Sequence, residues 1–370
     1  MFKNSWTIGH VFGIPIRLHI TLLIILPLFG FIFGTNIGLL TETLGLDPDA
    51  LLLSPYTIGF LIGIGLFVSV ALHEIGHTWV ALRRGLKIRS ITLMILGGIA
   101  DMEEMSKDPS DELVIAIMGP IVSLVLGILF LGLRFIVVNA PADLHIFLLY
   151  LGQINIVLAV FNLLPAFPSD GGRVLRAIMA KRRSYLAATK TATSIGQTFA
   201  ILFAIFGVLT GNILLVLIAF FIYIAAGQEY STNLVNATLE GFRVRDLMTN
   251  DVVTVPAHYT VAQLLALMYD EKHTGYPVLA DGAVVGCVTM EDVQKVAPGD
   301  RDYYKVEDIM SQALQMVHPD DDAVEALTRM SREQIGRLFV FDELNLVGII
   351  TRSDIMKGFQ IRQIEKTRAE

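Results

Sequence analysis

The sequence predicts a polytopic α-helical membrane protein, with six transmembrane helices and a small membrane-surface β-element, followed by an α/β part built from a repeat. The 370-residue chain is 54% hydrophobic and only 17% charged, whereas a typical soluble domain has roughly 25% charged residues. The long apolar runs fall almost entirely within residues 16–230. Beyond residue 240 the charged residues return at ordinary density, which marks a domain boundary.

Net charge and cysteine content exclude some classes of partner and bond. A formal charge of −7 is too mild for a nucleic-acid partner, so none is expected. Cys287 is the single cysteine, so no intrachain disulfide can form. Because it stands in the apolar run 284–288, it is interpreted as a buried small hydrophobe in preference to a reactive thiol.

Six segments are apolar enough to cross a membrane, which takes about 20 residues per helix. They lie at about 16–34, 57–82, 111–137, 144–165, 190–210 and 212–230. The connections at 36–55, 138–143 and 211–212 contain no Lys or Arg, whereas the alternate connections are basic. Because basic loops stay on the cytoplasmic side, we expect a multi-pass cell-membrane protein with both termini and the C-terminal part in the cytoplasm.

The segment 86–106 is short for a spanning helix and is better interpreted as a small β-element at the membrane surface. Its first half is rich in β-branched residues, and Gly97-Gly98 then favours a turn. Unpaired backbone is costly in lipid, so this β-element must pack on protein or line water.

The second predicted span contains His73-Glu74-Ile75-Gly76-His77. Imidazoles four residues apart share one helix face, and catalytic zinc takes such ligands while keeping one position for water. Glu74 can take the proton from that water. His73 lies about 15 Å of helix before the basic Arg83, so the site is submerged from the cytoplasmic side. Ionisable groups at that depth are seldom kept without a use; the alternative is a satisfied polar cluster between helices.

Two histidines leave a tetrahedral zinc ion short of a protein ligand. At the end of the fourth span, two prolines and the pair Gly171-Gly172 break the helix. This predicts Asp170 on unwound backbone, free to turn inward, as the best third ligand. His19 and His145 compete on ligand type, but interfacial positions explain them better.

Two motifs in separate spans carry a family resemblance: His73-Glu74-x-x-His77 and Asn162-x-x-Pro165-x4-Asp170-Gly171. Together they resemble the site-2 protease family of intramembrane metalloproteases, over about residues 10–230. The resemblance implies that His73, His77 and Asp170 bind one Zn²⁺ and that Glu74 activates the water. It also implies that Asn162 holds the substrate or the developing oxyanion; a helix cap or an interhelical hydrogen bond is the alternative.

The implied activity is hydrolysis of peptide bonds within or near transmembrane segments of membrane-tethered substrates, as in regulated intramembrane proteolysis. The implied substrate is a transmembrane protein, such as a membrane-tethered regulator. A helical substrate must first be unwound, and pairing with an exposed strand compensates for the lost hydrogen bonds. Residues 88–96 are the candidate strand; a purely structural hairpin is the alternative.

The C-terminal part is an internal repeat, because several pairs of like residues are each 62 positions apart. The pairs are Asp246 and Asp308, Met248 and Met310, Gly286 and Gly348, Thr289 and Thr351, and Asp292 and Asp354. Each copy is predicted to run strand, helix, strand, strand, helix. The repeat resembles a tandem CBS-domain pair over about residues 241–360, and the six-span layout resembles the archaeal and bacterial proteases that carry one.

The CBS resemblance implies an adenine nucleotide, ATP, ADP or AMP, as ligand. By it Thr289 and Thr351 reach phosphate, and Asp292 and Asp354 accept hydrogen bonds from ribose. Arg337 stands where some members place a phosphate-binding arginine, and its repeat counterpart is Gly275. The alternative is that each Thr and Asp only caps a helix.

These observations predict a transmembrane metalloprotease domain at 1–235, a first CBS domain at 241–298 and a second at 303–362. The expected partners are the substrate, membrane lipid, an adenine nucleotide and a second copy bound through the CBS pair. A CBS-gated transporter and a catalytically inactive relative are the alternative functions. Neither needs a Glu between two helical histidines and an Asp-Gly at matching depth.

Overall fold

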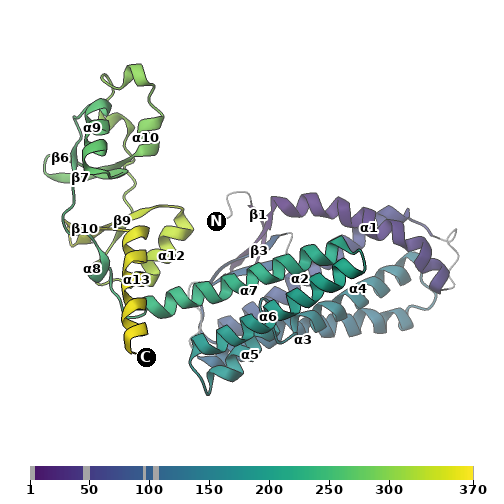
Figure 1. The fold of residues 1–370 in the computed structure, drawn as a ribbon. Coiled ribbons are helices and arrows are strands. Elements are labelled where there is room, and N and C mark those ends of the chain that lie inside the picture. The colour runs from purple at the N-terminus through teal and green to yellow at the C-terminus, as the bar shows by residue number, and fades with distance from the viewer. Residues whose placement is uncertain (1–4, 45–50, 95–96, 103–107, 370) are drawn as a thin grey trace. The chain divides into compact units, whose positions relative to one another are not determined.

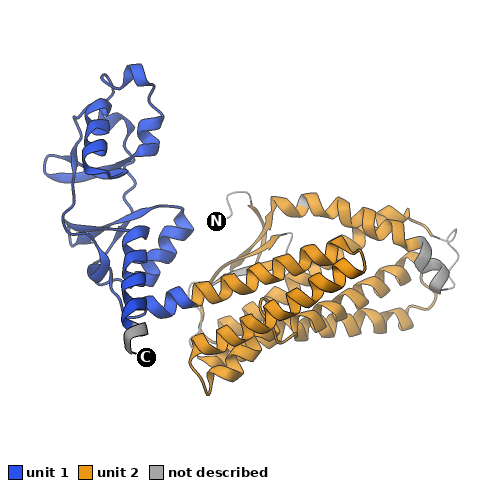
Figure 2. Ribbon diagram, in the orientation of Figure 1, with its two compact units in different colours: residues 1, 234–370 blue, residues 2–233 orange. Residues whose placement is uncertain are grey.

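The computed structural model describes residues 5–44, 51–94, 97–102 and 108–369. The chain divides into two compact units, residues 2–233 and residues 1 and 234–370 (Figure 2). Six of the described helices are long and apolar enough to cross a membrane, which confirms the predicted number of spans.

The spanning helices pack as a bundle (Figure 1). They are α1 (Ile20–Leu44), α2 (Pro55–Arg83), α3 (Pro109–Ile136), α4 (Ala142–Asn162), α6 (Tyr185–Leu209) and α7 (Ile213–Leu239). Ser54, Asp108 and Ser184 precede α2, α3 and α6, and each accepts a backbone N–H of the first turn. Such caps satisfy donors that have no partner inside the helix.

Small residues bring the spanning helices close together. Where α1 and α2 meet, a Cβ added to Gly34 would lie 2.9 Å from the Tyr56 Cα, and one added to Gly59 would lie 2.5 Å from the Gly30 carbonyl oxygen. Ile37, Ile58, Ile62 and Ile146 form a buried apolar cluster in the same bundle. Close backbone approach through small residues is a common way for helices to associate in lipid.

A four-stranded sheet accompanies the bundle, in the order β1 (Ser5–Val11), β2 (Ile14–His19), β3 (Ile88–Met94), β4 (Gly97–Met102). The β3–β4 pair is antiparallel and is the predicted β-element. Strands β1 and β2 were not predicted: residues 16–19, assigned to the first span, are strand. The turn at Phe12-Gly13, with φ of 54° and 79°, makes a hairpin of the N-terminus, and β2 pairs in parallel with β3.

The second unit contains two copies of one fold, in which a short helix that was not predicted precedes the predicted strand, helix, strand, strand, helix. The first has α8 (Val244–Leu247), β5 (Val255–Pro256), α9 (Val261–Glu271), β6 (Gly275–Ala280), β7 (Ala283–Thr289) and α10 (Met290–Gln294). The second has α11 (Val306–Ile309), β8 (Met316–Val317), α12 (Ala323–Glu333), β9 (Arg337–Asp342), β10 (Asn345–Thr351) and α13 (Arg352–Ala369). Each copy has a three-stranded sheet.

The first helical turn of each copy packs into the hydrophobic core of the other copy. Val244 is buried with Leu338 and Ile350 of the second copy, whereas Val306 is buried with Val278 and Val288 of the first. The repeated methionines and glycines are partners in this exchange. Space beside Gly348 is filled by Met248, and space beside Gly286 by Met310. The repeated methionine of each copy therefore packs against the repeated glycine of the other copy, so the same contact is formed twice.

Cys287 lies in β7 and is half-buried. Burial raises the pKa of its thiol, and a thiol with a raised pKa is a poor nucleophile at neutral pH. This supports its interpretation as a packing residue.

Candidate metal centre

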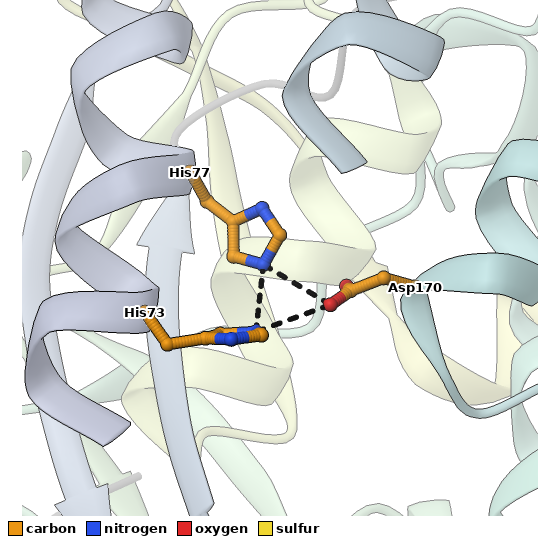
Figure 3. Close-up of side chains that lie close together, drawn as sticks. All are labelled: His73, His77 and Asp170. Carbon is orange, nitrogen blue, oxygen red and sulfur yellow. Dashed lines mark hydrogen bonds and ion pairs between the residues drawn. The ribbon is translucent and has the colours of Figure 1, made fainter. Parts of the chain in front are cut away.

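Three side chains from distant parts of the sequence meet inside the bundle (Figure 3). His73 and His77 lie on successive turns of α2, and Asp170 is the first residue of the short helix α5 (Asp170–Ala180). The two Nε2 atoms are 3.1 Å apart, and each lies 3.2 Å from Oδ2 of Asp170. Both histidines are buried, 4% and 6% exposed.

This donor set fits a zinc ion. Tetrahedral donors at zinc–ligand distances of about 2.0–2.2 Å lie roughly 3.3 Å from one another, close to the observed separations. Nδ1 of His77 lies 2.7 Å from the Ile115 carbonyl oxygen, which can only accept, so in the neutral ring this nitrogen donates and Nε2 carries the lone pair. A lone pair that faces a second ring nitrogen and a carboxylate oxygen needs a cation or a proton between them.

Helix α3 supplies a stripe of contacts behind the two rings. Ile115, Gly119 and Ser123 are spaced four residues apart, so they share one helix face. Ile115 accepts from His77, and Oγ of Ser123 lies 2.9 Å from Nδ1 of His73. A Cβ on Gly119 would overlap the Nε2 atoms of both histidines. Such partners fix the tautomer and orientation of metal-binding histidines.

The α3 stripe was missed at the sequence level. The spacing Gly119-x3-Ser123 in an apolar span was the available signal, because small residues four apart mark a close helix contact. The sequence could not show which helix that face meets.

Asp170 reaches the centre in a way that differs from the prediction. The residue does not lie on unwound backbone, because it begins α5. Gly171 and Gly172, expected to break the chain's helical course, are part of the helix α5. A Cβ on Gly171 would overlap the Leu163 and Leu164 backbone, and one on Gly172 would lie 2.5 Å from the Phe167 nitrogen. The glycines therefore let α5 pack against the loop that precedes it.

Glu74 follows His73 on α2 and lies beside β4. A Cβ on Gly98 would overlap Cγ of Glu74 and lie 3.1 Å from its Oε1. The bare backbone of Gly98 thus makes room for this carboxylate next to the two histidines.

The remaining candidates make other contacts. Asn162 ends α4, and its Nδ2 donates to the Leu158 carbonyl oxygen of its own helix at 3.0 Å. Nδ1 of His19 lies 3.0 Å from Oγ1 of Thr21 at the end of β2. Over the described ranges, neither His19 nor His145 joins a group of side chains that could hold a metal.

In the second unit, the repeated Thr and Asp residues form capping pairs. Thr289 donates to Asp292 through its backbone N–H at 3.0 Å and its hydroxyl at 2.7 Å. Thr351 and Asp354 repeat this arrangement at 3.1 and 2.6 Å. The capping alternative thus describes the observed geometry.

Arg337 reaches from the second copy to the first. Its Nη2 donates to Oγ1 of Thr274 at 2.9 Å. Its guanidinium fills the space where a side chain on Gly275 would stand. The glycine at the equivalent repeat position therefore makes room for the single arginine.

Comparison with known proteins assigns a family to both units. Residues 61–142 and 136–206 match Peptidase family M50, and residues 244–299 and 306–360 match the CBS domain. The CBS domain-containing protein YhcV of Bacillus subtilis is 32% identical over 114 residues, which are 30% of this chain and 81% of YhcV. A solved site-2 protease from Methanocaldococcus jannaschii covers 61% of this chain and 95% of its own, with 36% identity and a TM-score of 0.43.

The similarity of a further relative extends along the whole chain. A zinc metalloprotease of Methanocaldococcus jannaschii is 36% identical over 360 residues, which are 96% of each protein. This match includes both the spanning helices and the repeat. The chain therefore belongs to peptidase family M50, as a multi-pass membrane zinc metalloprotease of the site-2 protease type with tandem CBS domains.

Proposed function

We propose that His73, His77 and Asp170 hold one zinc ion, and that this centre cuts peptide bonds within or near transmembrane segments of membrane-tethered proteins. One observation carries the proposal. Three ligand atoms, two of them from a spanning helix, come within 3.1–3.2 Å of one another although Asp170 is 93 residues beyond His77. The substrate class is inferred from the location of the histidines on the spanning helix α2. A peptide bond must reach this helix within the membrane to be cut, so the substrate is itself a membrane protein.

A zinc ion held there would supply the Lewis acidity that activates a water molecule and the scissile carbonyl. The protein's own contribution to the proton transfers is Glu74. Its carboxylate takes the proton from the attacking water and later gives it to the leaving amine. Asn162 would bind the substrate carbonyl or its oxyanion once its amide leaves the Leu158 carbonyl oxygen.

The strand expected to receive the substrate needs a correction. Residues 88–94 form β3, which is paired on both sides, with β2 and with β4; residues 95–96 lie outside the described residues. Among the described strands, β4 is at the edge of the sheet next to α2. We therefore assign substrate pairing to the free edge of β4, where Gly98 lies against Glu74.

The test is cleavage of a panel of single-span substrates by the purified full-length protein. Metal removal by a chelator should abolish cutting, and added zinc should restore it. Glu74→Gln should still bind one zinc per chain but should not cut. A wild-type protein that binds zinc and cuts no member of the panel would favour the inactive relative.

Adenine nucleotide binding to the CBS pair is a second proposal. It is supported by the CBS match and by the Arg337 guanidinium at the junction of the two copies. ATP, ADP and AMP should each be tested for a shift in the unfolding temperature of the full-length protein. Arg337→Met should lose any shift, whereas Arg332→Met, at a half-buried arginine in the last turn of α12, should keep it. No shift with any nucleotide would leave the CBS pair as a structural module.

We further propose that both termini and the CBS pair are cytoplasmic, from the alternation of basic and uncharged connections. Reporter fusions at the C-terminus and in the 138–143 connection should report opposite sides of the membrane. Pairing of two chains through their CBS units stays a prediction, for which the mass of the detergent-solubilised protein is the measurement.

A further inference from the structure

A fully buried arginine lies on the same short helix as Asp170. Arg176 of α5 is only 1% exposed, and a buried charge is very costly unless it is paired and hydrogen-bonded. Two carboxylates from other helices provide the pairing. Glu112 of α3 accepts from Nε at 2.8 Å and also from Nη2, and Glu229 of α7 accepts from Nη1 at 2.7 Å. One guanidinium thus joins three helices.

The faces of the same guanidinium are covered by aromatic rings. Its carbon lies 4.8 Å from the ring centre of Phe167 and 4.7 Å from that of Tyr185. Phe167 belongs to the loop that leads into Asp170 and is itself buried. Arg176 belongs to the helix that follows Asp170, and it also contacts the loop that precedes Asp170.

The three ligand side chains are supported unequally. His73 and His77 are placed by one long helix, α2, whose turns fix their spacing. Asp170 comes from an 11-residue helix that follows a loop, so its distance from the histidines needs a separate constraint. Helix α3 provides a common reference: Glu112 holds Arg176, and one turn further along, Ile115 begins the stripe that holds the rings of the two histidines.

We propose that Arg176 is a positioning residue of the metal centre, which holds Asp170 at ligand distance from the histidines by tying α5 and its preceding loop to α3 and α7. This inference rests on the proposed role of Asp170 as a zinc ligand. A cluster of buried ions is often no more stable than apolar side chains of similar size. Its advantage over them is directional: the planar guanidinium fixes the angle and depth of α5 through hydrogen bonds.

The first experiment measures zinc affinity of the full-length, metal-free protein by competition with a chelator. Arg176→Met should weaken zinc binding by about 10–100-fold, the usual effect of losing a group that orients a metal ligand. Arg84→Met is the matched control. It removes an exposed arginine that pairs with Asp111, the neighbour of Glu112 on α3, and should leave zinc affinity unchanged.

A second pair of variants separates positioning from stability. Arg176→Met leaves the partly buried carboxylates of Glu112 and Glu229 without their cation and will lower the unfolding temperature. The triple variant Arg176→Met, Glu112→Leu, Glu229→Leu removes all three charges and should recover much of that temperature, while zinc affinity stays low. Glu229→Gln keeps the shape of the side chain, and should give a smaller loss of affinity in a folded protein.

Two results would overturn the inference: unchanged zinc affinity in Arg176→Met and Glu229→Gln, or recovery of zinc affinity along with the unfolding temperature in the triple variant. Two other results would instead contradict the assignment of the zinc ligands. If folded wild-type protein takes up no zinc, or if Asp170→Ala binds zinc as tightly as the wild type, the proposed centre itself is wrong.

Discussion

Nδ1 of His73 lies 2.9 Å from Oγ of Ser123, one turn beyond Gly119 on α3. This contact fixes the ring so that Nε2 faces the other two ligand atoms. Ser123→Ala should therefore weaken zinc binding by about tenfold, as measured by chelator competition. Ser69→Ala is the control, because Ser69 is a buried serine of α2 that bonds Asn155 and Gly65. Equal losses in both variants would point to general loosening of the bundle.

Gly119 leaves the space in which a metal ion would contact both histidines. Gly119→Ala places a methyl group over their Nε2 atoms, so zinc content after purification should fall to near zero and cleavage should vanish. Gly132→Ala lies on the same helix, where a Cβ meets nothing within 4 Å. That variant should retain zinc, and a bound zinc ion in Gly119→Ala would contradict the proposed location.

Gly98 separates the role of the carboxylate from that of the metal. Gly98→Ala pushes on Cγ of Glu74, and the three atoms nearest to the added methyl group all belong to Glu74. The turnover rate should fall by at least an order of magnitude while zinc affinity stays within about twofold, because misplacement of a catalytic group by 1 Å can cost about 100-fold in rate. Gly9→Ala, in open space on β1, should cut normally.

Asp292 gives the CBS pair a dependence on pH. Burial would raise the pKa of Asp292, but hydrogen bonds from Lys295 and Thr289 outweigh it and hold the pKa below its usual range. A carboxylate with a lowered pKa stabilises the fold above its unfolded pKa, and that contribution is lost as the pH falls through the folded pKa.

Asp292→Ala should therefore reduce the free energy of unfolding by about 1 kcal/mol at pH 7. The difference from the wild type should shrink in acid, once Asp292 is protonated in both states. Hydrogen exchange of the β6 and β7 amides is the measurement, and Glu291→Ala on the exposed face of the same helix is the control. A difference that grows as the pH falls would refute the assignment.

The sequence predicted the elements that depend on local pattern. Six apolar runs gave six spans, because lipid demands about 20 apolar residues per helix. His73 and His77 followed from helical spacing alone. Asp170 was identified as a partner although its backbone was wrongly assigned, since its residue type and its place after a broken helix carried the information.

Contacts between distant segments were beyond the reach of local pattern. The hairpin of residues 5–19 depends on the pairing of β2 with the edge of β3. The sequence of residues 5–19 does not indicate this pairing. Gly119 is important because it faces His73 and His77, and Gly98 because it faces Glu74. The sequence does not show which side chains a glycine faces. Arg176 is one of several basic residues after the fourth span, and its sequence neighbours do not indicate the two carboxylates, on α3 and α7, that pair with it.

The exchange of first turns between the two CBS copies sets an order in time. The core of the first copy includes Val306, with Met310 packed against it, and synthesis reaches them only after every strand of that copy has been made. During synthesis, the hydrophobic core of the first copy therefore stays incomplete until the first helical turn of the second copy has been made. A chain that stops near residue 300 would therefore expose an open core at the ribosome and be a target for quality-control proteases.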